Sequence, residues 1–160
     1  MMEIKDSGAR RNFETGAVRD IADDKGRCDL LPLAEVSTLL DNNVIIRSIG
    51  FYVDSGEKSY LRCAIKSFCA ERGWDIIYAI FEVSKHYEAG AKKYAERNWE
   101  KGIPLHCYID SGVRHYLKYL RGDNDEPHDR AFIWNMLGAL WTQKNKPELI
   151  DLPFKDVVTG

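Results

Sequence analysis

Four segments between residues 57 and 142 repeat apolar residues with the period of an α-helix, and this pattern most constrains the fold. Periodic apolar faces of this length predict amphipathic helices that bury one side against each other. We predict helices at 57–72, 74–94, 104–121 and 125–142. Gly73 and Gly122 follow two of them, as glycine commonly does, while Asp125 as N-cap and Pro127 suit the start of the last. The pattern therefore predicts an all-α bundle.

The rest of the chain gives weaker structural signals. Pro32 opens a short predicted helix at 33–40, whereas the apolar, β-branched segment 43–53 fits a strand or a buried helix equally well. Residues 1–29 are polar and glycine-rich, so we expect an arm that lies outside the core. The tail from Asn145 onward is expected to be flexible or to dock. All 160 residues then form one domain, a helical bundle with a polar N-terminal arm.

Composition narrows the classes of function. Hydrophobic residues make up 44% and charged residues 30% of the chain, and the net charge of −2 argues against a nucleic-acid partner. No apolar run is long enough to cross a membrane, and the N-terminus lacks the apolar core of a secretion signal. The four cysteines form no C-x-x-C pair, which disfavours a zinc ribbon. We expect them to be structural, reduced thiols of a cytoplasmic protein.

A polar stripe follows the predicted helix 104–121. Its members recur at spacings of four, four and three: Asp110, Arg114, Lys118 and Arg121, with His115 at the border. One interpretation is a solvated face with an ordinary ion pair between Asp110 and Arg114. The other is a phosphate-binding surface, because arginine can hold a phosphate with two donors and lysine adds a point charge.

The second half of the predicted helix 125–142 is apolar on most sides, which indicates burial. One strip through it nevertheless contains His128, Ala131, Asn135 and Ala139. A buried amide needs hydrogen-bond partners, so Asn135 is either a satisfied core residue or part of a pocket wall where the alanines leave room for a ligand. The residues alone leave both interpretations open.

Acidic residues gather at the start of that helix: Asp123, Asp125, Glu126 and Asp129. Glu126 and Asp129 have the E-x-x-D spacing that can hold one cation, and Asp125 forms a rival pair with His128. Carboxylate oxygens favour Mg²⁺ or Mn²⁺. The alternative is that these acids only complement the helix dipole.

The helix predicted at 74–94 combines an apolar stripe with further acids. The stripe contains Ile77, Ile80, Phe81, Tyr87, Ala91 and Tyr94. Glu88 lies beside this stripe and could point inward, which makes it the remaining candidate for an acidic site. Glu82 and His86 form an i,i+4 pair that we expect to be exposed.

Several separate motifs together resemble one known family. The chain contains, in order, FETGAVRDIADDKGRCDLLPL, YEAGAKKYAERNWEKGIPL, DSGVRHYLKYLRGDNDEPH and AFIWN. These segments resemble the phage dATP/dGTP diphosphohydrolases, which are MazG-like all-α pyrophosphohydrolases and include MazZ-type enzymes of phages that replace adenine with 2-aminoadenine. The resemblance implies metal-dependent hydrolysis of dGTP or dATP to the monophosphate and pyrophosphate. In such phages the dGMP feeds synthesis of the modified nucleotide.

The resemblance also directs attention to individual residues. The positions that match are Glu88, Arg114, His115, Asp125, His128 and Asn135. The catalytic candidates are Glu88, His115, Asp125 and His128, and the candidate ligands of Mg²⁺ or Mn²⁺ are Glu88, Asp125, Glu126 and His128. The candidates for binding the polyphosphate are Lys25, Arg27, Lys93, Arg114 and Lys118, and those for the base or sugar are Asn98, Trp99 and Asn135.

Two departures from the family pattern affect these expectations. The segment 37–76 is longer than the resemblance leads us to expect, and we interpret it as an insertion that caps the site or builds an oligomer interface. MazG relatives usually carry an E-x-x-E motif, but the Glu88 helix has none. We therefore expect the metal ligands to be rearranged.

The resemblance further implies a homo-oligomer, either a dimer or a tetramer, because MazG-like bundles generally complete their core by oligomerising. The location would be the cytoplasm, which is that of the host if the protein belongs to a phage. Three rival functions remain. They are a non-catalytic helical protein that binds a nucleotide or partner, a single-stranded nucleic-acid binder, and an HD-type phosphohydrolase suggested by His128-Asp129.

Overall fold

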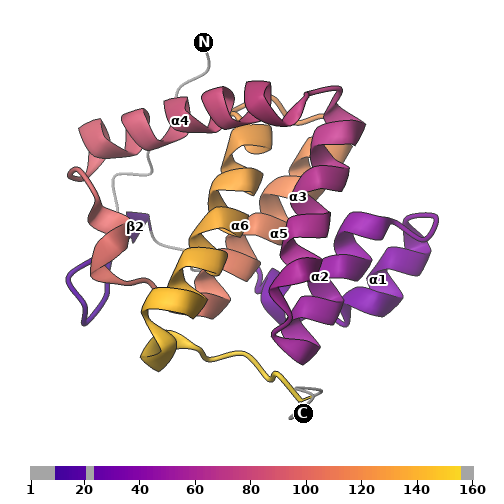
Figure 1. Cartoon of the computed structure of the whole chain (residues 1–160), viewed down its shortest axis with the longest axis horizontal. Coiled ribbons are helices and arrows are strands. Elements are labelled where there is room, and N and C mark those ends of the chain that lie inside the picture. Colours follow the sequence, from indigo (N-terminus) through magenta and orange to yellow (C-terminus); the bar gives the residue numbers. More distant parts are fainter. Residues whose placement is uncertain (1–9, 21–23, 156–160) are drawn as a thin grey trace.

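The computed structural model describes residues 10–20 and 24–155, which contain six α-helices and one two-stranded sheet (Figure 1). The α-helices are α1 (Leu33–Leu39), α2 (Val44–Ser55), α3 (Lys58–Arg72), α4 (Ile76–Lys93), α5 (Leu105–Arg121) and α6 (His128–Asn145). The short elements are β1 (Arg10–Asn12), β2 (Val18–Asp20) and the 3₁₀ turns η1 (Cys28–Leu30), η2 (Asn98–Lys101) and η3 (Pro147–Leu149). The prediction of an all-α bundle is confirmed, and the undecided segment 43–53 belongs to α2.

The core is centred on the hairpin of α5 and α6, against which α3 and α4 pack, and α2 covers α3. Figure 1 shows α4 running across the upper ends of these helices. Phe68 of α3 is fully buried, with the rings of Tyr119 and Phe132 at 5.0 and 4.8 Å between centroids. Leu61 and Phe68 lie on the α3 face that the helical period predicted, and both are buried as expected.

Two glycines allow α5 and α6 to approach each other closely. A Cβ atom added at Gly138 would lie 2.2 Å from the Tyr108 ring, and one added at Gly112 would lie 2.4 Å from the methyl group of Met136. Carbon atoms cannot pack at such distances, so a larger residue would force the helices or these side chains apart. The close packing brings the polar residues of the two helices within reach of one another.

The helix ends follow the sequence with one exception. Gly73 and Gly122 end α3 and α5 in the left-handed conformation, with φ of 78° and 88°. The prediction that Asp125 caps the last helix is wrong, because α6 begins at His128 and Pro127 occupies the cap position. The Asp125 carboxylate instead lies 2.8 Å from Nε2 of His128.

The N-terminal arm is partly built into the core. Strands β1 and β2 pair antiparallel, and Ala17 in the turn between them is fully buried. The expectation that residues 1–29 lie outside the core is therefore wrong for Ala17; residues 1–9 and 21–23 lie outside the described residues. The Asn98 side chain accepts a hydrogen bond from the Val18 N–H and donates one to its carbonyl, both at 2.9 Å. These two bonds attach the hairpin to η2.

The C-terminal tail docks onto the bundle, which is one of the two expectations for it. The Phe154 ring lies 5.5 Å from that of Tyr52, and its N–H donates to the carbonyl of Val53. Asp151 binds His106 at the start of α5 through the side chain and the backbone N–H. Residues 156–160 lie outside the described residues.

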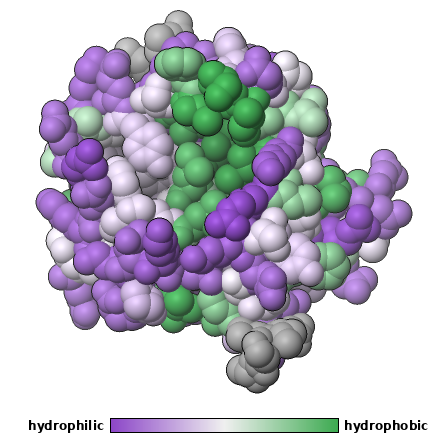
Figure 2. Space-filling view, in the orientation of Figure 1, coloured by the Kyte–Doolittle hydropathy of each residue, from purple (hydrophilic) through white to green (hydrophobic). Residues whose placement is uncertain are grey.

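The helix α4 turns much of its apolar surface to solvent. Ile77, Ile80 and Phe81 are 60%, 57% and 65% exposed, although they belong to its apolar stripe. Figure 2 shows a hydrophobic area over the middle of α4 that continues onto α6. The bundle instead buries the opposite side of α4, which includes Glu82, and this burial overturns the expectation that Glu82 is exposed. None of the helices that the structure describes is long and apolar enough to cross a membrane.

Candidate functional site

A cavity of about 290 Å³ lies between the β-hairpin, the C-terminal half of α4, η2, α5 and α6. Its described lining has seven basic and three acidic side chains, which makes it cationic in a chain whose net charge is −2. The basic residues are Arg11, Arg19, Lys25, Lys93, Arg97, Arg114 and Lys118, and the acidic residues are Asp20, Asp110 and Glu126. A cleft lined by one sign of charge raises the local concentration of ligands of the opposite sign, so the cavity suits an anion.

Arg19 extends from β2 into this cavity and is held between aromatic rings. Its guanidinium carbon lies 5.5 Å from the centroid of Trp134 and 5.7 Å from that of Tyr108. One of its terminal nitrogens donates to Oδ1 of Asn135 at 3.3 Å, and the other donates to the carbonyl of Cys107. The cation is thus fixed in orientation by the walls of α5 and α6.

A second cation from α4 reaches the same strand. Lys93 is only 10% exposed and forms an ion pair with Asp20 at 2.9 Å. The same Asp20 carboxylate accepts hydrogen bonds from Arg10 and from the Tyr94 hydroxyl. Asp20 therefore joins β1, β2 and the end of α4 at the rim of the cavity.

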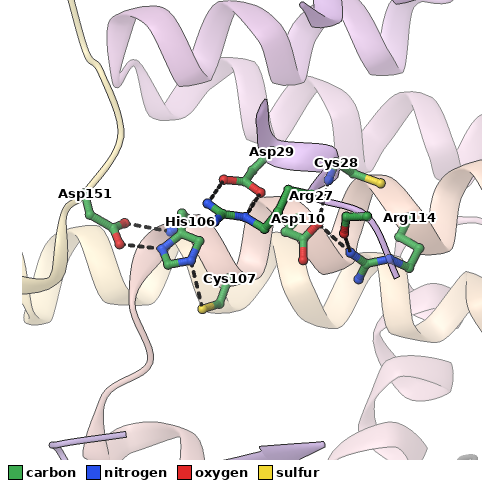
Figure 3. Close-up of polar contacts among 9 residues, drawn as sticks. Arg27, Cys28, Asp29, His106, Cys107, Asp110, Arg114 and Asp151 are labelled. Carbon is green, nitrogen blue, oxygen red and sulfur yellow. Dashed lines mark hydrogen bonds and ion pairs between the residues drawn. The ribbon is translucent and has the colours of Figure 1, made fainter. Parts of the chain in front are cut away.

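The predicted polar stripe of α5 is buried at Asp110 and Arg114, whereas Arg121 at its end is 71% exposed and pairs with Asp123. Asp110 and Arg114 form their ion pair with side chains only 6% and 12% exposed. Figure 3 shows that both side chains are directed at the N-terminal arm, where Asp110 accepts from the Cys28 N–H and Arg114 donates to the carbonyl of Gly26. The pair therefore holds the segment that presents Lys25 to the cavity.

Two imidazole rings meet where α5 faces α6. Nδ1 of His115 lies 2.8 Å from Nδ1 of His128, and Nε2 of His128 lies 2.8 Å from the Asp125 carboxylate. Burial lowers the pKa of His115 well below its ordinary value, and the neighbouring His128 lowers it further. His115 is therefore neutral at pH 7, with a nitrogen lone pair that can accept a proton or bind a cation.

The same rings belong to two groups of residues that fit a divalent cation. Ligand atoms of His115, Glu126 and His128 lie within 4.8 Å of one another, as do those of Asp123, Asp125 and His128. The first group lines the cavity through His115 and Glu126. Its two nitrogens and one carboxylate suit Mn²⁺ better than Mg²⁺, which favours an all-oxygen shell. The donor set is thus compatible with a divalent metal and agrees with the expected ligands Glu126 and His128.

Aromatic rings form the opposite wall of the cavity. Tyr87, Trp99 and Trp134 line it, and Tyr87 lies 5.8 and 5.9 Å from the other two between ring centroids. Asn135 is 1% exposed and donates to the carbonyl of Ala131, while its oxygen accepts from Arg19 as described above. Asn135 is therefore both a satisfied buried amide and part of the cavity wall, so each of its two interpretations holds in part.

The structure brings together most, but not all, of the residues proposed from the sequence. The cavity is lined by Lys25, Lys93, Asn98, Trp99, Arg114, His115, Lys118, Glu126 and Asn135, and His128 and Asp125 adjoin it. Glu88 is outside this lining, because its side chain is 72% exposed and lies 3.6 Å from Lys92. Arg27 is also outside this lining, and its Nε and one terminal nitrogen donate to Asp29.

The structure also changes the interpretation of Asn98 and of the Glu126–Asp129 motif. Asn98 accepts from the Val18 N–H and donates one N–H to the Val18 carbonyl, so it holds the hairpin and keeps its second N–H for a base edge. Asp129 binds Arg72 at 3.2 Å, which separates it from the E-x-x-D pair with Glu126. The motif therefore does not act as a pair of ligands in this arrangement.

Sequence reasoning missed the contribution of β2 and of His86. Arg19 and Asp20 are the R-D of the T-G-A-x-R-D segment, which was the one signal that could have identified them. His86 lines the cavity rather than pairing with Glu82 on the surface, and burial lowers its pKa to about 4. Its Nδ1 has no hydrogen-bond partner among the described residues, so it can accept one from a ligand.

Comparison with known proteins identifies the segment that builds this cavity. The family model described as dATP/dGTP diphosphohydrolase, N-terminal, matches residues 76–152, which is nearly half of the chain. None of the curated proteins and none of the solved structures matches the chain significantly. The matched segment extends from α4 to η3 and contains His115, Glu126 and His128. This segment is therefore similar to the N-terminal region of the dATP/dGTP diphosphohydrolases, which are enzymes.

Proposed function

We propose that this protein hydrolyses a purine deoxynucleoside triphosphate, dGTP or dATP, between the α- and β-phosphates. Water attacks the α-phosphorus, the bond to the bridging oxygen breaks, and the products are the monophosphate and pyrophosphate. The observation that carries the proposal is the cationic, aromatic cavity beside His115, Glu126 and His128, within the segment that matches the family. Such a cavity offers every kind of contact that this substrate needs.

Basic side chains at the arm and on α5 are proposed to hold the polyphosphate. Arg114 is fixed by Asp110 and Gly26, and Lys25 and Lys118 line the cavity beside it. Phosphoryl transfer is catalysed mainly by positioning and charge stabilisation, so cations fixed before the substrate arrives are the important feature. Lys93 adds a positive charge from α4 at the opposite rim.

The aromatic wall is proposed to receive the purine. Trp99, Tyr87 and Trp134 present large flat surfaces, and aromatic rings stack on bases without regard to their hydrogen-bonding edges. The unpartnered Nδ1 of His86 is the group best suited to read one edge of the base. It takes this role beside Asn98, whose oxygen and one N–H already bind Val18.

His115, Glu126 and His128 would hold Mg²⁺ or Mn²⁺, which neutralises phosphate charge and lowers the pKa of bound water. Asp125 binds Nε2 of His128 and so directs Nδ1 of this ring toward His115, where it can act as a ligand or orient the attacking water. Glu88 lies outside this group in a single chain, and its predicted role as a ligand requires a change in position or a second chain.

The test is the set of products formed from a panel of deoxynucleoside triphosphates with Mg²⁺ or Mn²⁺, separated by anion-exchange chromatography. We expect dGMP or dAMP and pyrophosphate in equal amounts. Release of triphosphate and nucleoside would indicate the HD-type rival instead. Binding of dGTP without any product, at high protein concentration, would indicate a non-catalytic nucleotide-binding protein.

We also propose the context in which this reaction takes place. The dGMP formed from dGTP would supply synthesis of a 2-aminoadenine nucleotide in the cytoplasm of an infected cell, as the resemblance to phage enzymes suggests. The exposed apolar residues of α4 support a homodimer or tetramer, because an exposed apolar area beyond isolated residues marks an interaction surface. A comparison of infected cultures with and without an active protein, by analysis of the bases in phage DNA, tests the first point.

A further inference from the structure

Three polar residues form a chain where the C-terminal tail meets the start of α5. Figure 3 shows Asp151, His106 and Cys107 in this order, joined by hydrogen bonds. Both Asp151 oxygens bind His106, one accepting from its backbone N–H at 2.8 Å and the other contacting Nδ1 of its ring. The other ring nitrogen of His106, Nε2, lies 3.5 Å from the sulfur of Cys107.

The carboxylate fixes the ring in a useful orientation. Because Nδ1 faces Asp151, only Nε2 can exchange a proton with the Cys107 sulfur. Asp151 is also the main cause of the raised pKa of His106, which reaches about 10. A positive imidazolium beside a sulfur at the first turn of a helix is the environment in which cysteines become nucleophilic.

Cys107 differs from the other cysteines in what it faces. Cys107 is one of the residues that line the cavity although it is only 4% exposed, so the cavity is the route by which a reagent would reach it. Cys63 is exposed on α3, and its only described side-chain partners are the hydroxyls of Ser48 and Ser67. The expectation that all four cysteines have only structural roles does not account for this difference.

We propose that Cys107 is a modification site, a reactive thiol in the cavity that small peroxides oxidise to the sulfenic acid. His106 and Asp151 are its positioning residues. The proposal rests on these contacts and on the cavity, and it does not depend on the identity of the nucleotide.

The Cys107 thiolate attacks one oxygen of hydrogen peroxide, so the S–O bond forms as the O–O bond breaks. Sulfur loses two electrons and the peroxide gains them. The leaving hydroxide takes the proton from Nε2 of His106 and departs as water. The products are the sulfenic acid, neutral His106 and water.

The test treats the full chain with hydrogen peroxide, traps sulfenic acid with dimedone, and measures the initial rate at each cysteine by peptide mass spectrometry. We expect Cys107 to react about tenfold or more faster than the exposed Cys63. In His106→Asn, the side-chain amide can still bind Asp151, but nothing occupies the position of Nε2. The oxidation rate of Cys107 should therefore fall to the rate of Cys63 or below it. Cys63 is the internal standard, because its rate reports the peroxide concentration and whether the variant is folded.

Two results would overturn the proposal: a slower reaction at Cys107 than at Cys63 in the unmodified sequence, or a Cys107 rate that His106→Asn leaves unchanged. Should His106→Asn fail to fold, Asp151→Asn provides the second variant, since its remaining oxygen can still accept from the His106 N–H. Inorganic pyrophosphate added before the peroxide separates this proposal from the proposed function. If pyrophosphate does not slow a rapid oxidation of Cys107, this result contradicts the proposed phosphate site and leaves the proposal for Cys107 standing.

Discussion

At the scale of single residues, the side chain of Arg19 connects the elements that form the walls of the cavity. It reaches from the N-terminal hairpin across to α5 and α6, and its planar guanidinium lies near two aromatic rings while donating to Asn135. Lysine carries the same charge but cannot stack or donate in a fork. Replacement of Arg19 with lysine therefore tests the planar geometry of the guanidinium, because the charge stays the same.

Replacement of Arg19 with lysine should lower kcat/KM by about tenfold to thirtyfold. A cation–π contact in a desolvated site contributes roughly 2 kcal/mol, and each tenfold change in rate corresponds to about 1.4 kcal/mol. Steady-state kinetics with dGTP and dATP measures the effect. The matched control is Arg62→Lys on the exposed face of α3, which should change neither kinetics nor unfolding. Equal activity of the two variants would show that the planar geometry of the Arg19 guanidinium is not needed for catalysis.

The metal ligands can be distinguished by comparing two glutamates. Glu126→Gln should raise the Mn²⁺ concentration needed for half-maximal activity by about tenfold or more, because it removes a charged donor from the group with His115 and His128. Glu88→Gln should leave that concentration within about twofold, because Glu88 is exposed beside Lys92. A large effect of Glu88→Gln would instead favour the role that the family resemblance assigns to it.

At the scale of secondary-structure elements, the close contact of α5 with α6 determines where the two histidines meet. Gly138 faces the Tyr108 ring and Gly112 faces Met136, so the helix axes are as near as small residues permit. His115 and His128 lie on these same helices and are 2.8 Å apart. Any residue that separates the helices should therefore affect both stability and metal binding.

Gly138→Ala should destabilise the fold by about 1–3 kcal/mol, since the added methyl group would overlap the buried Tyr108 ring. Gly90→Ala on α4 is the matched control, because its methyl group would meet nothing within 4 Å and alanine favours helix by about 0.5–1 kcal/mol. Urea unfolding followed by circular dichroism gives both values. The two substitutions should change stability in opposite directions, and a stabilising Gly138→Ala would contradict the packing described.

The docking of the tail onto α5 should depend on pH. The pKa of His106 is raised to about 10 in the folded protein, chiefly by Asp151. A raised pKa contributes stability that is complete below the unfolded value near 6.5 and is lost as the pH rises toward 10. The loss of stability in Asp151→Asn should therefore be larger at pH 6 than at pH 9, as measured by urea unfolding. A constant difference between the proteins would mean that the ion pair does not contribute.

At the scale of the whole molecule, the local patterns were easier to predict than the contacts between distant segments. The helices and the strip of His128 and Asn135 followed from spacing along one helix, which depends only on residues close in sequence. The contribution of Arg19 could not be predicted in this way, because its position against α6 depends on how the arm folds over the bundle. The exposure of Ile80 was missed for a related reason, since a periodic apolar stripe does not tell which chain covers it.

That exposed stripe leads to the prediction for the assembly. Ile77, Ile80 and Phe81 lie within two turns of α4 and are more than half exposed, which is costly for a chain that remains alone in water. We expect analytical ultracentrifugation to give at least twice the 18.4 kDa mass of the chain. Ile80→Glu should shift the protein to the monomer, because a charge buried at an apolar interface lacks a partner. Leu39→Glu, at a residue of α1 that is 82% exposed, is the control and should leave the mass unchanged. A monomeric unmodified protein would show that the apolar face of α4 has another role, and an assembly that survives Ile80→Glu would place the interface elsewhere.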